Sequence, residues 1–91
     1  MSNRSDLIER LRTAHQFPGP YTFKVIGENH PDLESTVRET LAEVTVTDIQ
    51  PRLSKNANHV SLTVKVQAQT PESLLDSYDA LAALEHVKYV L

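Results

Sequence analysis

The stretch that decides the fold spans residues 17–27 and reads FPGPYTFKVIG. It contains both glycines and both phenylalanines of the 91-residue chain. Its two prolines exclude a helix at its start, because each proline pushes the residue before it toward extended geometry. Residues 21–26 are rich in aromatic and β-branched side chains, so we predict a strand with Phe23 and Val25 facing the core. Gly27 is expected to turn the chain after this strand.

Composition describes one ordinary globular domain. Hydrophobic residues make up 40% of the chain and charged residues 23%, and the net charge of −3 gives no reason to expect nucleic acid or an acidic membrane as a partner. The absence of cysteine excludes disulfides, thiolate catalysis and cysteine-based metal sites. No apolar run approaches the ~20 residues of a membrane span, and the N-terminus lacks a hydrophobic signal core. We therefore expect a cytoplasmic protein.

Three helices are predicted from apolar spacing and from their first residues. A polar arm over residues 1–16 contains a short helix at about 6–14. A second helix is expected over residues 31–43, with His30 as its cap and a proline in its first turn. The third helix runs from Thr70, a hydroxyl cap followed by proline and glutamate, to about residue 84.

Three further strands complete the pattern, at residues 47–54, 59–69 and 86–91. The run 59–69 alternates apolar and polar side chains through its whole length, which indicates a half-buried strand. Pro51 lies within the first of the three and favours an edge position for it, because proline cannot donate a ladder hydrogen bond. The residues Lys55-Asn56-Ala57-Asn58 are expected to form a hairpin turn.

After the arm, the order of elements is β-α-β-β-α-β. Short connections and right-handed crossovers then predict an α+β, ferredoxin-like sandwich with a four-stranded antiparallel sheet in the order 4-1-3-2. The two helices of this pattern, at residues 31–43 and from Thr70 to about residue 84, should cover one face of the sheet. We accordingly divide the chain into an arm, residues 1–16, and one domain, residues 17–91.

The face of the sheet opposite the helices is predicted to be polar and positive. Acidic residues concentrate on the helices, and Asp48 is expected to be the only acid within a strand. This face could bind an anionic ligand or an acidic partner, or it could be solvated or covered by the N-terminal helix. RNA is disfavoured because the outward positions of the central strands hold no aromatic side chain for base stacking. The candidate interaction face comprises Lys24, Arg52, Thr63, Lys65 and Lys88.

No pattern in the chain predicts catalysis. Two glycines are too few for a dinucleotide fingerprint, and no glycine-flanked serine forms a nucleophile elbow. His30, His59 and His86 should lie near one end of the sheet, but they lack the spacing of metal ligands. We therefore predict no catalytic residue, no metal site and no cofactor.

A series of motifs runs along the chain after the arm: Phe17-Pro18, Tyr21, Phe23-Lys24-Val25-Ile26-Gly27, Ser54-Lys55-Asn56, Asn58, Val60-Ser61-Leu62-Thr63-Val64 and Val87-Lys88-Tyr89-Val90-Leu91. In their order and spacing these motifs resemble the YbeD-like family, a group of small bacterial proteins of unknown function. The chain departs from the family pattern at Ala57, where glycine is common, and at His59, where an aromatic residue is common, so the type of hairpin turn is left open.

The resemblance implies a ferredoxin-like fold similar to ACT regulatory domains, with no established catalytic residue. ACT-like domains bind small effectors near the loop after the first strand, usually at a dimer interface. By position, that loop holds Gly27, Glu28, Asn29 and His30, which the residues alone also allow to be a turn and a helix cap. Gene neighbourhoods in the family imply a link to lipoate metabolism.

Two functional hypotheses follow. The leading one is a non-catalytic regulatory or interaction domain that binds an unidentified protein partner and could form a homodimer through its sheet. The alternative is an ACT-like sensor of a small-molecule effector.

Overall fold

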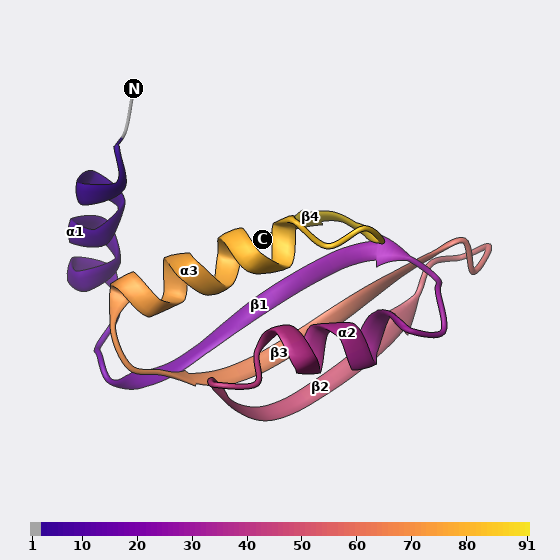
Figure 1. The fold of residues 1–91 in the computed structure, drawn as a ribbon, viewed down its shortest axis with the longest axis horizontal. Helices are drawn as coiled ribbons and strands as arrows, with labels where there is room; N and C mark the ends of the chain where they lie inside the picture. The colour runs from indigo at the N-terminus through magenta and orange to yellow at the C-terminus, as the bar shows by residue number, and fades with distance from the viewer. Residues whose placement is uncertain (1–2) are drawn as a thin grey trace.

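The computed structural model describes residues 3–91, which form an antiparallel sheet with two helices on one face and a third helix at one end (Figure 1). Met1 and Ser2, the start of the predicted arm, lie outside the described residues. The elements are α1 (Arg4–Ala14), β1 (Gly19–Glu28), α2 (Leu33–Thr40), β2 (Thr45–Leu53), β3 (His59–Ala68), α3 (Pro71–Ala82) and β4 (Val87–Val90).

The four strands have the order β2-β3-β1-β4, which is 4-1-3-2 when counted from the β4 edge. The two central strands pair over ten positions, from Gly19 opposite Ala68 to Glu28 opposite His59. β2 lies at an edge, where Pro51 leaves no central ladder bond unmade. The architecture is the α+β, ferredoxin-like arrangement that the order of elements predicts.

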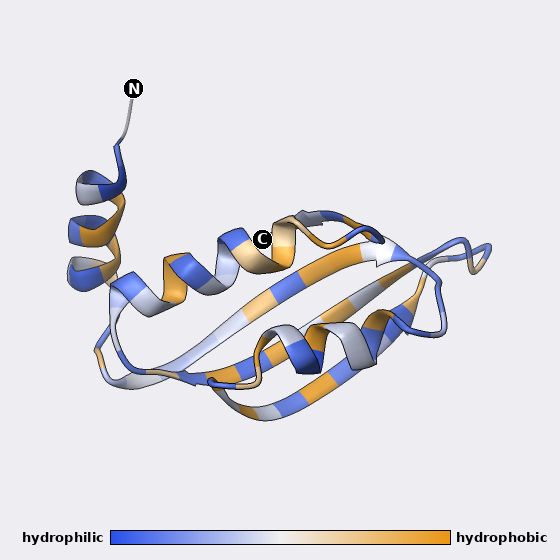
Figure 2. Cartoon of the chain, viewed as in Figure 1, coloured by the Kyte–Doolittle hydropathy of each residue, from blue (hydrophilic) through white to orange (hydrophobic). Residues whose placement is uncertain are grey.

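The core lies between the sheet and the helices α2 and α3. Strand residues enter it at every second position, and Figure 2 shows this alternation of apolar and polar residues along the strands. Burying one large aliphatic side chain stabilises the fold by ~1.5–3 kcal/mol, so these contacts dominate its stability. The least exposed core side chains, at 2% or below, are Phe23, Val25, Leu33, Val37, Leu41, Leu62, Val64, Val66, Leu74 and Leu81.

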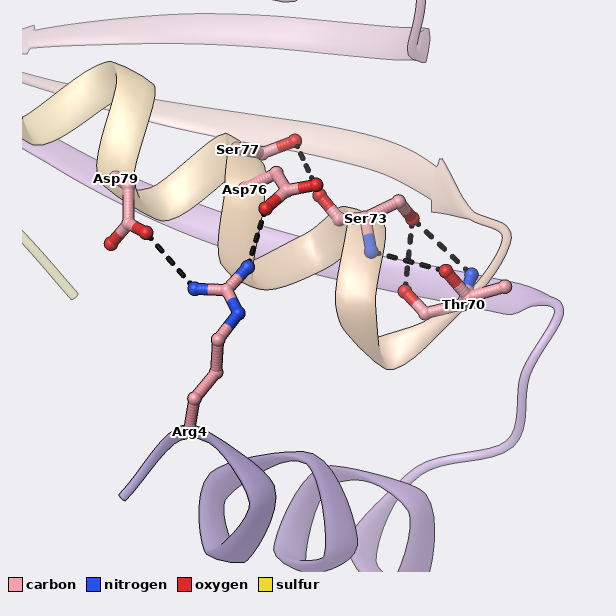
Figure 3. A network of polar contacts seen from close by, with 6 residues as sticks. All are labelled: Arg4, Thr70, Ser73, Asp76, Ser77 and Asp79. Atoms are coloured by element: carbon pink, nitrogen blue, oxygen red, sulfur yellow. Dashed lines mark hydrogen bonds and ion pairs between the residues drawn. The ribbon is translucent and has the colours of Figure 1, made fainter. Parts of the chain in front are cut away.

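α3 begins with the cap that the sequence predicts. The Thr70 hydroxyl accepts a hydrogen bond from the Ser73 amide at 3.0 Å, and the Ser73 hydroxyl accepts one from the Thr70 amide at 3.3 Å (Figure 3). Pro71 occupies the first turn, where its missing amide costs nothing. This reciprocal pair fixes the start of the helix, and a cap of this kind contributes ~1 kcal/mol.

α2 is shorter than predicted at both ends. Asp32 is its N-cap, and residues 41–43 form turns. His30 lies before the helix, where its Nδ1 accepts a hydrogen bond from the Asp32 amide at 3.1 Å. The prediction of His30 as the cap was therefore wrong by two residues, although its side chain does satisfy one amide near the helix start.

β1 is longer than the predicted strand at residues 21–26. It starts at Gly19 and continues through Gly27 to Glu28, because its pairing with β3 extends over that whole length. The prediction that Gly27 turns the chain was wrong, and so was the prediction that Asp48 is the only acid in a strand. Glu28 places a second carboxylate in the sheet.

α1 packs beside α3 at one end of the helical layer and leaves the opposite face of the sheet open (Figure 1). None of its residues is buried. Of the predicted positions for the arm, covering the open sheet face is therefore excluded. Within residues 3–91, no helix is both long enough and apolar enough to cross a membrane.

Candidate functional site

The first candidate site is the end of the sheet where β1, β4 and the β2–β3 hairpin meet. Gly27 stands at a point of close approach there, with an ordinary negative φ. A Cβ added to Gly27 would lie against the backbone oxygen of His86 at a distance that real Cβ atoms do not adopt, and 3.3 Å from Cδ2 of Leu33. Glycine is needed at this position because two other segments of the chain occupy the space of a side chain.

Glu28 is the best-connected polar residue at this end. Its amide donates to the backbone oxygen of His86 at 2.9 Å, and its carboxylate lies 3.2 Å from Nδ1 of His86 and 3.8 Å from Nζ of Lys88. The hydrogen bond from His86 is the largest effect on the pKa of Glu28 and lowers it. Desolvation raises this pKa by less than the hydrogen bond lowers it, and the charge of Lys88 lowers it further. Glu28 is therefore an ionised carboxylate that joins β1 to β4.

Two histidine rings stack beside this carboxylate. The rings of His30 and His86 have centroids 3.8 Å apart and planes inclined by 14°. Because Nδ1 of His30 accepts from the Asp32 amide, its neutral ring carries the proton on Nε2. His59, the third histidine predicted at this end, pairs with Glu28 across the central strands. Within residues 3–91, no three His, Cys, Asp or Glu side chains are placed to hold a metal ion.

Asn29 ties the loop after β1 to the hairpin. Its side-chain amide donates to the backbone oxygen of Ala57 at 2.8 Å, and its backbone amide donates to the oxygen of Asn58 at 3.1 Å. Ala57 has φ of 59°, in the left-handed region that favours glycine. The turn type left open by the sequence is thus one that places an alanine at positive φ.

The four positions implied for an effector divide into two kinds. Gly27 allows the close approach of the His86 backbone, and the side chain of Asn29 is hydrogen-bonded to the hairpin. Glu28 and His30 present side chains that share a cluster with His86. That cluster offers a carboxylate, two imidazoles and the ammonium of Lys88, which are groups that can hydrogen-bond a small polar molecule.

The second candidate site is the open face of the sheet. Lys24 lies opposite Thr63, Lys65 opposite Thr22, and both alternate with core residues on the central strands. Arg52 lies opposite Ser61 on the same face. Lys88 reaches this side as well, but it contacts Glu28. The five predicted face residues are therefore all on the open side, together with the carboxylates of Glu28 and of Asp48, which lies opposite Lys65.

β4 brings apolar side chains to the same face. Tyr89 lies opposite Ile26, and Leu91 exchanges both backbone hydrogen bonds with Lys24. Tyr89 and Leu91 are 53% and 62% exposed, and together with the half-buried Ile26 they form an apolar strip, which we call the β4 strip.

Sequence reasoning missed the β4 strip because the pairing of β1 with β4 shifts register between Ile26 and Gly27. The shift places both Val87 and Val90 toward the core, which strict alternation does not allow. The signal that could have revealed it is the spacing of these two valines. Two core-type residues three positions apart in a strand indicate an extra residue between them.

The sandwich is a small α+β domain with an ACT-like fold. A solved ACT domain from the GTP pyrophosphokinase of Chlorobium tepidum superposes with a TM-score of 0.68 at 11% identity, covering 80% of this chain and 95% of that one. The C-terminal domain of the MgtC protein from Mycobacterium tuberculosis gives a TM-score of 0.62 at 20% identity, covering 85% and 87%. At these identities the likeness concerns the fold alone.

Residues 12–91 match the family described as "Protein of unknown function (DUF493)", and the chain belongs to this family. A UPF0250 protein of Paraburkholderia phytofirmans is 36% identical over 80 residues, covering 84% of this chain and 90% of that protein. A UPF0250 protein of Neisseria gonorrhoeae is 34% identical over 93 residues, covering 98% and 94%. The resemblance to the YbeD-like family is thereby confirmed.

Proposed function

We propose that this protein is a non-catalytic regulatory module of the bacterial cytoplasm that binds an acidic protein partner on its open sheet face. The observation that carries the proposal is the combination of unpaired cations with an exposed apolar strip. Within residues 3–91, Lys24, Arg52 and Lys65 make no ion pair, whereas Lys88 is paired with Glu28. Lys24 lies beside Leu91 at the β4 strip, and Lys65 and Arg52 follow on the next two strands, so this face suits a partner that presents an apolar residue together with acidic ones.

The size of this face favours a transient complex. Strand residues rise by ~3.3 Å and strands lie ~4.8 Å apart, so the sheet presents roughly 500 Å² to a partner. That is below the ~800 Å² per partner of a standard stable interface and within the range of weak signalling contacts. A regulatory module that associates reversibly fits such an area.

The test is capture from a native bacterial lysate, compared between two matched charge-reversal variants. Lys24→Glu with Lys65→Glu alters the open face, and Arg38→Glu with Lys55→Glu makes the same change in net charge on α2 and the hairpin. We expect the first variant to lose the proteins captured by the wild type, and the second to retain them. Circular dichroism would establish that both variants are folded. Equal capture by both variants would refute the proposal.

A second candidate function is that of a small-metabolite sensor. The ACT-like fold supports it, as does the cluster of Glu28, His30, His86 and Lys88 at the loop after β1. Thermal-shift measurements against amino acids and lipoate-related acids test it directly. Saturable stabilisation that is lost in Glu28→Gln would favour the sensor, and a flat response to every compound would count against it.

A further inference from the structure

A cleft separates α1 from α3 on the helical side of the molecule, away from the open sheet face. Its volume is ≈ 480 Å³. Side chains from three elements line it, and most of them are apolar: Leu7, Leu11, Ala14, Tyr21, Leu75 and Tyr78. Pockets of roughly 300–1,000 Å³ with apolar walls and a few polar groups are typical of small-molecule sites.

Ion pairs attach both ends of α1 to α3 beside this cleft. At the first turn, the Arg4 guanidinium contacts the carboxylates of Asp76 and Asp79 (Figure 3). At the last turn, Arg12 lies 3.6 Å from the carboxylate of Glu72. Between these anchors, α1 buries no residue and Leu7 remains 41% exposed. Leu11, between the anchors, is half-buried against the core, whereas Leu7 leaves the neighbouring apolar surface of the cleft uncovered.

The cleft also has a hydrogen-bond donor. The hydroxyl oxygens of Tyr21 and Tyr78 lie 3.0 Å apart, so one donates to the other and the second proton is available to a ligand. Burial raises the pKa of Tyr78, and the bond to Tyr21 raises it further, so its phenol stays neutral.

Arg10 supplies the charge at the cleft. Within residues 3–91, it makes no ion pair, unlike the two other arginines of α1. Asp79 also lines the cleft, where it shares the Arg4 guanidinium with Asp76. Among the described residues, Arg10 is thus the cation of the cleft lining that no carboxylate contacts.

We propose that this cleft binds a small amphipathic anion, with its apolar body between α1 and α3 and its carboxylate at Arg10. The walls match an aliphatic or aromatic body because they are made of leucine, alanine and tyrosine. A neutral molecule would leave the guanidinium unused, and a cation would be repelled by it. Leu7 and Arg10 precede residue 12, where the family match begins, so membership of the family does not supply this site.

The probe is decanoate, compared with decyltrimethylammonium, both below their micellar concentrations, and with 1-decanol below its solubility limit. Binding is followed by two-dimensional NMR of the full chain labelled with nitrogen-15. We expect saturable shifts from decanoate at Tyr21, Leu75 and Tyr78. The alcohol should bind at least about tenfold more weakly, because it lacks the carboxylate that makes a charge-assisted hydrogen bond with Arg10.

Two variants decide the assignment. Arg10→Gln should weaken decanoate binding about tenfold, whereas Arg38→Gln, the same change on the exposed side of α2, should leave it unaltered. Ala14→Phe should fill the cleft and abolish binding while the spectrum stays that of a folded protein. Shifts that map to the β4 strip, or equal affinity of the alcohol and the acid, would overturn the proposal, and so would an unaltered affinity in Arg10→Gln.

Discussion

Replacing Ala57 by glycine should stabilise this protein. Ala57 has φ of 59° in the hairpin between β2 and β3. Its backbone is held there from both sides, because its amide donates to the oxygen of Ser54 at 2.9 Å and its own oxygen accepts from Asn29 at 2.8 Å. Both bonds use backbone atoms of residue 57, so glycine retains them and removes only the Cβ that opposes this conformation.

The magnitude follows from two opposing effects. The left-handed conformation costs an L-residue ~1–2 kcal/mol, which glycine does not pay. Glycine makes the unfolded chain more flexible, which costs ~0.4–1 kcal/mol. The difference is a gain of about 0.5–1 kcal/mol in the free energy of unfolding. For a chain of this size, that corresponds to a rise in Tm of roughly 3–6 °C.

Urea denaturation and scanning calorimetry measure both quantities. Ala80→Gly provides the matched control, because Ala80 is exposed within α3 and has no positive φ. The same chemical change there should destabilise the protein by ~1 kcal/mol. If both variants lose stability equally, the hairpin does not store the strain assigned to it, and the reasoning is refuted.

Three further predictions concern the loop cluster and the tyrosine pair. Gly27→Ala should lower the free energy of unfolding by ~1–3 kcal/mol in urea, because its methyl group collides with the backbone oxygen of His86; an unaltered midpoint would contradict the close approach. Because the folded pKa of Glu28 is lowered from 4.5, its stabilising effect is present above pH 4.5 and disappears as the pH falls through the folded value. The stability difference between wild type and Glu28→Gln should therefore shrink from pH 7 to pH 3, and a constant difference would exclude this linkage. The raised pKa of Tyr78 predicts the opposite sign at high pH, where stability falls as the pH rises above its ordinary value of 10. Absorbance titration should find one of the three tyrosines ionising only with alkaline unfolding, and Tyr78→Phe should remove that component.

Some residues of the candidate site can be predicted from their neighbours in sequence, and others depend on contacts between distant segments. The positions Glu28 and His30 are selected through the resemblance to ACT-like domains, because they come after the strand predicted at residues 21–26. Their partner His86 cannot be selected in this way, because it comes from the other end of the chain and reaches them through pairing of β1 with β4. The open face was predictable in its lysines, which follow the alternation of the central strands, but not in Tyr89, which depends on a register shift.

The sequence by itself determined the elements and their order. The alternation of residues 59–69 and the cap at Thr70 act over a few neighbouring residues, so periodicity and capping chemistry predict them from the chain alone. Only the tertiary structure decided the positive φ of Ala57, the need for glycine at position 27 and the cleft behind α1. Each of these depends on contacts between segments distant in sequence, and such contacts can override local backbone preferences.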